Sequence, residues 1–197
     1  MKIIKQDATF EGTRTKGSRF IAFVFAVQTR TDCAEKLAQV RQQHPNASHI
    51  CYAWILSNEG SFYSDDGEPT GSAGRPILQH VQGRNLTNVL AVSVRYFGGT
   101  KLGVGGLIRA YGNSIALVLD MVELEEDIVL ETMSFFYDYD VQKHIQKIVS
   151  NHSDMYVSVE HQYREQICTQ IQVPLEHVFF IRQQLIEGTS GRIIFVD

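Results

Sequence analysis

The chain has 197 residues, of which 44% are hydrophobic and 20% are charged, an ordinary composition for a globular protein that is long enough for two compact domains. No apolar run approaches the roughly 18 residues needed to cross a bilayer, and the N-terminus lacks a signal-peptide core, so we expect a cytoplasmic protein without membrane contact. The net charge of −4 argues against a general nucleic-acid binder, yet it is uneven: residues 1–124 carry 13 basic and 10 acidic side chains, and residues 125–197 carry 5 and 12.

The first half of the chain begins with two strand-like segments, the second ending in an apolar run over 20–27. Asp32 is predicted to cap a helix, with Glu35 three residues later as in a capping box, and the helix ends near Gln43. A strand follows over 49–56. The segment 57–75 is rich in Gly, Ser and Asp and is predicted to be one long loop, a feature that is usually functional or mobile.

After this loop we expect a short helix over 77–82, a central strand over 88–95 because that run is almost continuously apolar, and a helix over 105–121. The charged run 123–127 marks the expected domain junction. The remaining segments are predicted as strand, helix, strand, strand, helix and strand, over 128–137, 140–151, 155–162, 166–173, 175–186 and 192–196. This βαββαβ order is the ferredoxin-like split motif. The sequence therefore predicts an α+β protein with domains at 1–124 and 125–197.

The first motif with chemical potential is a turn-rich loop over 64–76, which contains Asp65, Asp66 and Glu68. Three carboxylates within four residues can bind a hard cation, although the spacing is not that of an EF-hand. Alternatively, the carboxylates accept hydrogen bonds from backbone N–H groups, or they pair with nearby arginines. We favour these structural roles and predict neither a metal site nor a cofactor.

The second motif covers 94–111 and joins the central strand to the following helix, where a backbone nest and a helix N-terminus can bind an anion. It is neither a Walker A loop nor a Rossmann fingerprint, so ATP and NAD are not expected. Close helix–sheet packing would explain its glycines but not its cations, and the stretch 69–119 has no acidic residue. Tyr96 and Phe97 can stack a base. We therefore predict an anion or nucleic-acid surface made of Arg75, Arg95, Tyr96, Gly98, Gly99, Lys101, Gly103, Gly105 and Arg109.

The third motif covers 47–54 and places His49 and Cys51 on the same side of a strand. A Cys–His nucleophile pair is conceivable, but no third partner or oxyanion donor is identified, and no Gly-x-Ser-x-Gly elbow occurs. We predict no catalytic residue. The three cysteines lack a Cys-x-x-Cys pair and are predicted to be buried structural thiols.

Taken together, these motifs resemble the YigZ/IMPACT family over about residues 16–119. The family pattern corresponds here to Lys16–Phe20, Ala47–Ala53, Ser64–Pro69 and Arg95–Tyr111. Its polar positions outside the basic motif are Lys16, Ser18, His49, Asp65, Asp66 and Glu68. The resemblance implies a first domain like domain IV of elongation factor G and a ferredoxin-like second domain like domain V of that factor. It also implies a role in translation, because eukaryotic IMPACT competes for a partner of the amino-acid-starvation kinase.

Three functions remain open at this point. The favoured one is a translation-associated binding protein that contacts RNA, the ribosome or a translation partner through the basic face of the first domain. The second is a protein–protein regulator without an anion site. The third is an enzyme acting on a small anionic metabolite, in which the cations hold the anion and the carboxylates of the 64–76 loop serve as acid, base or metal ligands.

Overall fold

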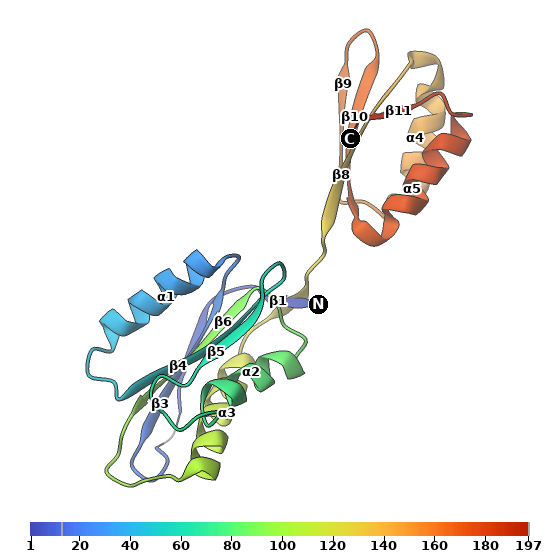
Figure 1. Ribbon diagram of the computed structural model, residues 1–197. Coiled ribbons are helices and arrows are strands. Elements are labelled where there is room, and N and C mark those ends of the chain that lie inside the picture. Colours follow the sequence, from blue (N-terminus) through green and yellow to red (C-terminus); the bar gives the residue numbers. More distant parts are fainter. Residues whose placement is uncertain (13, 197) are drawn as a thin grey trace. The chain divides into compact units, whose positions relative to one another are not determined.

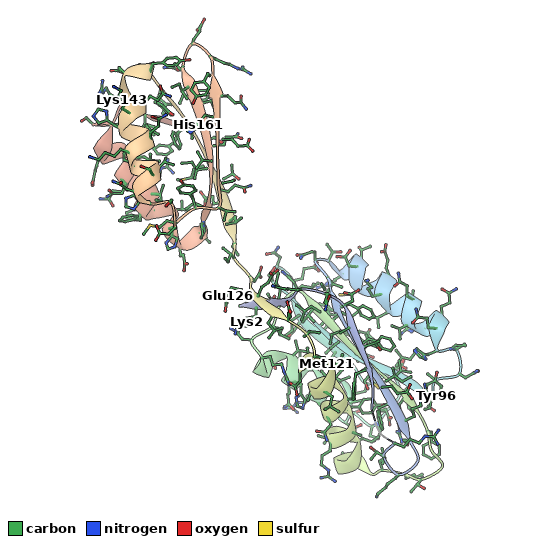
Figure 2. All side chains as sticks on the ribbon, turned by 180° about the vertical axis from the view of Figure 1, so that it is seen from behind. Lys2, Tyr96, Met121, Glu126, Lys143 and His161 are labelled. Atoms are coloured by element: carbon green, nitrogen blue, oxygen red, sulfur yellow. The ribbon has the colours of Figure 1, made fainter. Side chains whose placement is uncertain are left out.

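The computed structural model describes residues 1–12 and 14–196 and divides the chain into two compact units, Met1–Asp127 and Ile128–Asp197. The division falls three residues after the expected boundary. The reason is strand β7 (Leu124–Glu126), which pairs antiparallel with β1 (Lys2–Ile4) and so belongs to the first unit. Figure 2 shows Lys2 and Glu126 side by side at this ribbon, with their charged groups 3.9 Å apart.

The N-terminal unit is built on a five-stranded sheet in the order β2-β3-β6-β4-β5, in which all neighbours are antiparallel. Its strands are β2 (Ala8–Glu11), β3 (Arg19–Ala26), β6 (Val89–Tyr96), β4 (His49–Leu56) and β5 (Gly60–Ser64). Strand β6 lies at the centre and is buried along almost its whole length. Its apolar run had predicted this central position, because a strand covered on both faces needs no polar side.

Helices cover both faces of this sheet. Figure 1 shows α1 on one face and α2 with α3 on the other. These helices span Arg30–Gln43, Gly74–Gly83 and Val104–Leu119. Side chains alternate along a strand, so β3 contributes Phe20 and Ala22 to the core beneath α2 and α3, and Ile21 and Phe23 to the core beneath α1.

Two local predictions for this unit were wrong. The N-cap of α1 is Thr29 rather than Asp32: Thr29 Oγ1 accepts a hydrogen bond from Asp32 N at 3.1 Å, and the Asp32 carboxylate accepts one from Thr29 N at 2.9 Å. Asp32 thus occupies the third helical position of a capping box, where Glu is usual. The 57–75 segment is also not a continuous loop, because it contains the edge strand β5, whose exposed side chains leave no apolar alternation to read.

The C-terminal unit has the predicted ferredoxin-like fold. Its elements are β8 (Leu130–Tyr137), a 3-10 turn η1 (Tyr139–Val141), α4 (Gln142–Asn151), β9 (Ser158–Tyr163), β10 (Ile167–Pro174), α5 (Leu175–Gly188) and β11 (Ile194–Val196). The sheet order is β11-β8-β10-β9 with all neighbours antiparallel, which confirms the split βαββαβ motif. The core includes Phe135, Ile145, Ile171 and Leu185. Of the helices in the described residues, none combines the length and apolarity of a membrane span.

Candidate functional site

A buried ion pair lies at the centre of the family motifs. Arg95, near the end of β6, donates from Nη1 to Glu68 Oε1 at 2.5 Å, and the two side chains are 5% and 4% exposed. The hydroxyl of Tyr111, from α3, donates to the same carboxylate oxygen at 2.7 Å. Burial first, and then the neighbouring Cys51 and Glu68, raise the pKa of Tyr111, so its hydroxyl keeps its proton and remains a donor. This network ties the carboxylate loop to the sheet and to α3.

Ser18 connects this network to the backbone of the Gly-rich motif. Its Oγ accepts hydrogen bonds from Arg95 Nη2 at 3.3 Å and from Gly98 N at 3.2 Å. Gly98 approaches the other loop so closely that an added Cβ would lie 1.8 Å from the carbonyl carbon of Gly17. Only glycine fits at position 98, because any side chain would collide with backbone. The segments around Lys16 and Gly98 are therefore locked together.

Asp65 stabilises the start of α2. Its Oδ1 accepts hydrogen bonds from Ala73 N at 3.0 Å and Gly74 N at 2.8 Å, and its Oδ2 accepts one from Gly71 N at 2.8 Å. The prediction that this loop's carboxylates accept from backbone N–H groups is confirmed. Within residues 1–12 and 14–196, no group of three His, Cys, Asp or Glu side chains is arranged to hold a metal ion.

Asp66 holds His49 at the beginning of β4. The carboxylate of Asp66 accepts a hydrogen bond from Ile50 N at 2.6 Å, and its backbone carbonyl lies 2.8 Å from His49 Nδ1. Because a carbonyl only accepts, Nδ1 carries a hydrogen and donates it to Asp66 O. His49 Nε2 lies 3.9 Å from Glu68 Oε1, on the side of the ion pair.

Cys51 does not form a nucleophile pair with His49. Its Sγ donates to the carbonyl oxygen of Asp65 at 3.1 Å, whereas His49 Nδ1 is bonded to the carbonyl of Asp66. Burial raises the pKa of the Cys51 thiol to about 12, so the thiolate is absent at neutral pH. Cys33 is buried as predicted, whereas Cys168 is only half-buried.

A pocket of about 390 Å³ opens beside the ion pair. The start of α3 forms one wall, and the loop after β6 forms another. The lining residues are His49, Glu68, Pro69, Arg95, Phe97, Lys101, Leu102, Gly103, Val104 and Leu107. The Gly-rich motif and the carboxylate loop therefore meet at a single cavity, which we call the α3 pocket.

The predicted anion-binding residues lie in different surroundings. Lys101 and Gly103 line the α3 pocket together with Arg95, whereas Arg75 on α2 and Arg109 on α3 are exposed outside its lining. Arg109 nevertheless lies near Gly105, because an added Cβ there would be 4.0 Å from its Nη1. Gly98 and Gly99 form the exposed turn after β6.

Tyr96 and Phe97 lie on opposite sides of the strand end. The hydroxyl of Tyr96 bonds with His44 Nδ1 at 2.9 Å, and its ring packs into the core beneath α1. Figure 2 labels Tyr96 at the end of β6. Phe97 is 51% exposed and lines the α3 pocket, so it is the aromatic residue available to a ligand.

The sequence reasoning did not identify Tyr111 as a site residue. Its position on the apolar face of a helix was a signal, because the hydroxyl of a buried tyrosine usually finds a hydrogen-bond partner.

Comparisons with known proteins identify the family. The model of the Impact N-terminal domain matches residues 16–119. The chain is 32% identical over 196 residues to an IMPACT family member of Haemophilus influenzae, covering 98% of this chain and 94% of that protein. It is 40% identical over 124 residues to IMPACT family member YvyE of Bacillus subtilis, covering 62% of this chain and 57% of YvyE. The crystal structure of a hypothetical protein matches with a TM-score of 0.67 and 26% identity over 99% of this chain and 95% of that one. This chain belongs to the IMPACT family.

Proposed function

We propose that this protein acts in the regulation of translation and that it binds RNA through the loop surface, which we define as Phe97, Lys101, Arg109 and the backbone of residues 98–103. The observation that carries the proposal is the charge balance of this region. The stretch 69–119 contains no acidic residue, and Glu68 beside it is buried and paired with Arg95. The exposed cations of the loop surface therefore have no competing carboxylate within that stretch, which favours phosphate contacts.

The geometry favours unpaired RNA over a duplex. Phe97 is half-exposed, and an exposed aromatic ring can stack on a base that has left its helix. The guanidinium of Arg95 lies 5.5 Å from the centre of the Phe97 ring, which holds the ring in place. The family resemblance also supports RNA as the ligand, since a translation regulator meets ribosomal, messenger and transfer RNA.

The test is co-sedimentation with ribosomes and filter binding to total RNA across a salt series. The informative variant is Lys101→Ala/Arg109→Ala, because both side chains are exposed. The matched control is Lys143→Ala/Lys147→Ala, which removes the same charge from exposed positions on α4. Arg95→Ala is unsuitable because it would break the buried ion pair with Glu68.

We expect the affinity of the native protein to fall with salt. Loss of two phosphate contacts should lower the slope of log K against log salt by about 1.4 in the Lys101→Ala/Arg109→Ala variant and leave the control unchanged. Binding that does not depend on salt would overturn the proposal and indicate a protein contact on the ribosome. Equal losses in both double variants would place the RNA contact elsewhere on the chain.

A further inference from the structure

The α3 pocket shares Phe97, Lys101 and Gly103 with the loop surface and has features that a surface for RNA backbone does not require. The first is the N-terminus of α3. Helix α1 is capped by Thr29 and Asp32, and Asp65 accepts from Gly74 N at the start of α2, whereas α4 and α5 have no side-chain cap. Helix α3 begins after Gly103 with no side-chain cap and no acidic residue in its first turn. The leading N–H groups of a helix carry partial positive charge and bind anions.

The second feature is an unpaired donor in the pocket wall. Arg95 is only 4% exposed and lines the pocket, and its Nε has no hydrogen-bond partner among the described residues. Buried donors in proteins almost always have a partner, because leaving one unsatisfied is costly. Glu68 Oε1 already accepts from Arg95 Nη1 and from the Tyr111 hydroxyl. The guanidinium that carries this donor forms part of the pocket wall beside the start of α3.

The third feature is the chemistry of the remaining walls. Lys101 adds a second cation, while Pro69, Phe97, Leu102 and Leu107 make much of the lining apolar. The volume of about 390 Å³ is at the small end of ligand sites and exceeds what a bare phosphate needs. His49 lies on the same wall. These walls favour a ligand that combines an anion with a flat, partly apolar body.

We infer that the α3 pocket binds a single nucleotide as its monophosphate. The phosphate lies at the start of α3 beside Lys101 and Arg95, and the base lies against Phe97. The inference rests on the proposed function in so far as this nucleotide belongs to bound RNA. A free mononucleotide has the same chemistry, so the experiment measures both forms.

The experiment uses isothermal titration calorimetry on the full chain. The probes are adenosine and uridine monophosphates, the matching nucleosides, inorganic phosphate and a short single-stranded RNA. We expect the monophosphates to bind at least about tenfold more tightly than the nucleosides, which lack the charge that meets the helix terminus. Inorganic phosphate alone should bind more weakly than the monophosphates, because it leaves the apolar walls uncovered.

The decisive variant is Val104→Asp, at the first position of α3, where Val104 is 53% exposed. An acidic residue there favours the helix, so the variant should fold, but its charge repels a phosphate. Val104→Asn is the matched control, because it has nearly the same shape and no charge. We expect Val104→Asp to weaken monophosphate binding by at least about tenfold and Val104→Asn to change it by no more than about twofold. Thermal unfolding of both variants reports that the fold is intact.

The outcomes distinguish mononucleotide binding in the α3 pocket from RNA binding by the loop surface. RNA binding without mononucleotide binding, unaffected by Val104→Asp, overturns the pocket inference and leaves the proposed function standing. Mononucleotide binding without RNA binding supports the pocket and overturns the proposed function. Nucleosides that bind as tightly as monophosphates, or equal effects of Val104→Asp and Val104→Asn, overturn the placement of a phosphate at α3.

Discussion

Glu68 Oε1 and Arg95 Nη1 lie 2.5 Å apart in the interior of the N-terminal unit, although 27 residues separate the two positions in the chain. Neither side chain is more than 5% exposed. Removing one partner of such a pair strongly lowers the stability of the fold, because the remaining charge stays buried without compensation.

Arg95→Ala should therefore destabilise the protein by about 3–5 kcal/mol. The double variant Glu68→Gln/Arg95→Met should cost much less, since it removes both charges and keeps an oxygen for the Tyr111 hydroxyl. Urea unfolding of the native protein, Glu68→Gln, Arg95→Met and the double variant gives the coupling energy. Additive losses would mean that the two side chains do not depend on each other.

The contact of Gly98 with Gly17 predicts different costs at neighbouring glycines. Gly98→Ala should disrupt the joint between the two loops, because its Cβ would lie 1.8 Å from the Gly17 carbonyl carbon. A Cβ added at Gly99 would meet no atom within 4 Å, and only the φ of +83° is unfavourable for alanine. Gly99→Ala should therefore lower the free energy of unfolding by about 1–2 kcal/mol. Thermal unfolding compares the two variants, and equal losses would contradict the steric explanation.

The buried thiols predict a loss of stability at alkaline pH. Burial raises the pKa of Cys33 to about 11 and that of Cys51 to about 12, from an ordinary value of 9.0. Below pH 9 both states hold the proton, so the thiols cause no loss there. As pH rises above about 9, the unfolded chain ionises first, and the free energy of unfolding falls by up to about 1.4 kcal/mol per pH unit for each thiol, as far as about pH 11 for Cys33 and about pH 12 for Cys51.

This effect is measured by denaturant unfolding at a series of pH values. Cys51→Ala should reduce the slope above pH 9, because it removes the group whose ionisation favours the unfolded chain. Cys168→Ala is the control, since Cys168 is half-buried. A Cys51→Ala variant with the native slope would show that this thiol is not protected by the fold.

The role of Asp65 predicts a structural defect that metal ions do not repair. Asp65→Ala leaves the N–H groups of Gly71, Ala73 and Gly74 without their acceptor, and we expect a loss of about 2–3 kcal/mol. Added Mg²⁺ or Ca²⁺ should not move the melting temperature of the native protein. A metal-dependent rise that disappears in Asp65→Ala would instead assign a cation to this loop.

Much of the fold could be predicted from the sequence because the relevant signals are local. The apolar run of β6 predicted a strand buried on both faces, and the alternation in β10 contributed to the ferredoxin-like assignment. Strand β5 was missed because an exposed edge strand has no buried face to impose a pattern. The cap of α1 was misassigned because Asp32 and Thr29 are both good capping residues and only the backbone shows which one precedes the helix.

The candidate site was harder to predict because charge patterns count side chains without showing where they pair. The sequence placed Arg95 in the predicted anion surface and also allowed the loop carboxylates to pair with nearby arginines, but it did not show that Glu68 is the partner of Arg95. Tyr96 and Phe97 are adjacent and equally aromatic, but only Phe97 reaches the α3 pocket. Which of two neighbours faces a ligand depends on how the strand ends, and this is a property of the folded sheet.

The pairing of β1 with β7 also constrains how the protein is made. Lys2 leaves the ribosome before its partner Glu126, which follows more than a hundred residues later. The ribbon between them cannot close until β7 has been synthesised, so β1 has no β7 partner until then. Because the junction to the C-terminal unit begins at this ribbon, completion of the first unit coincides with the emergence of the second.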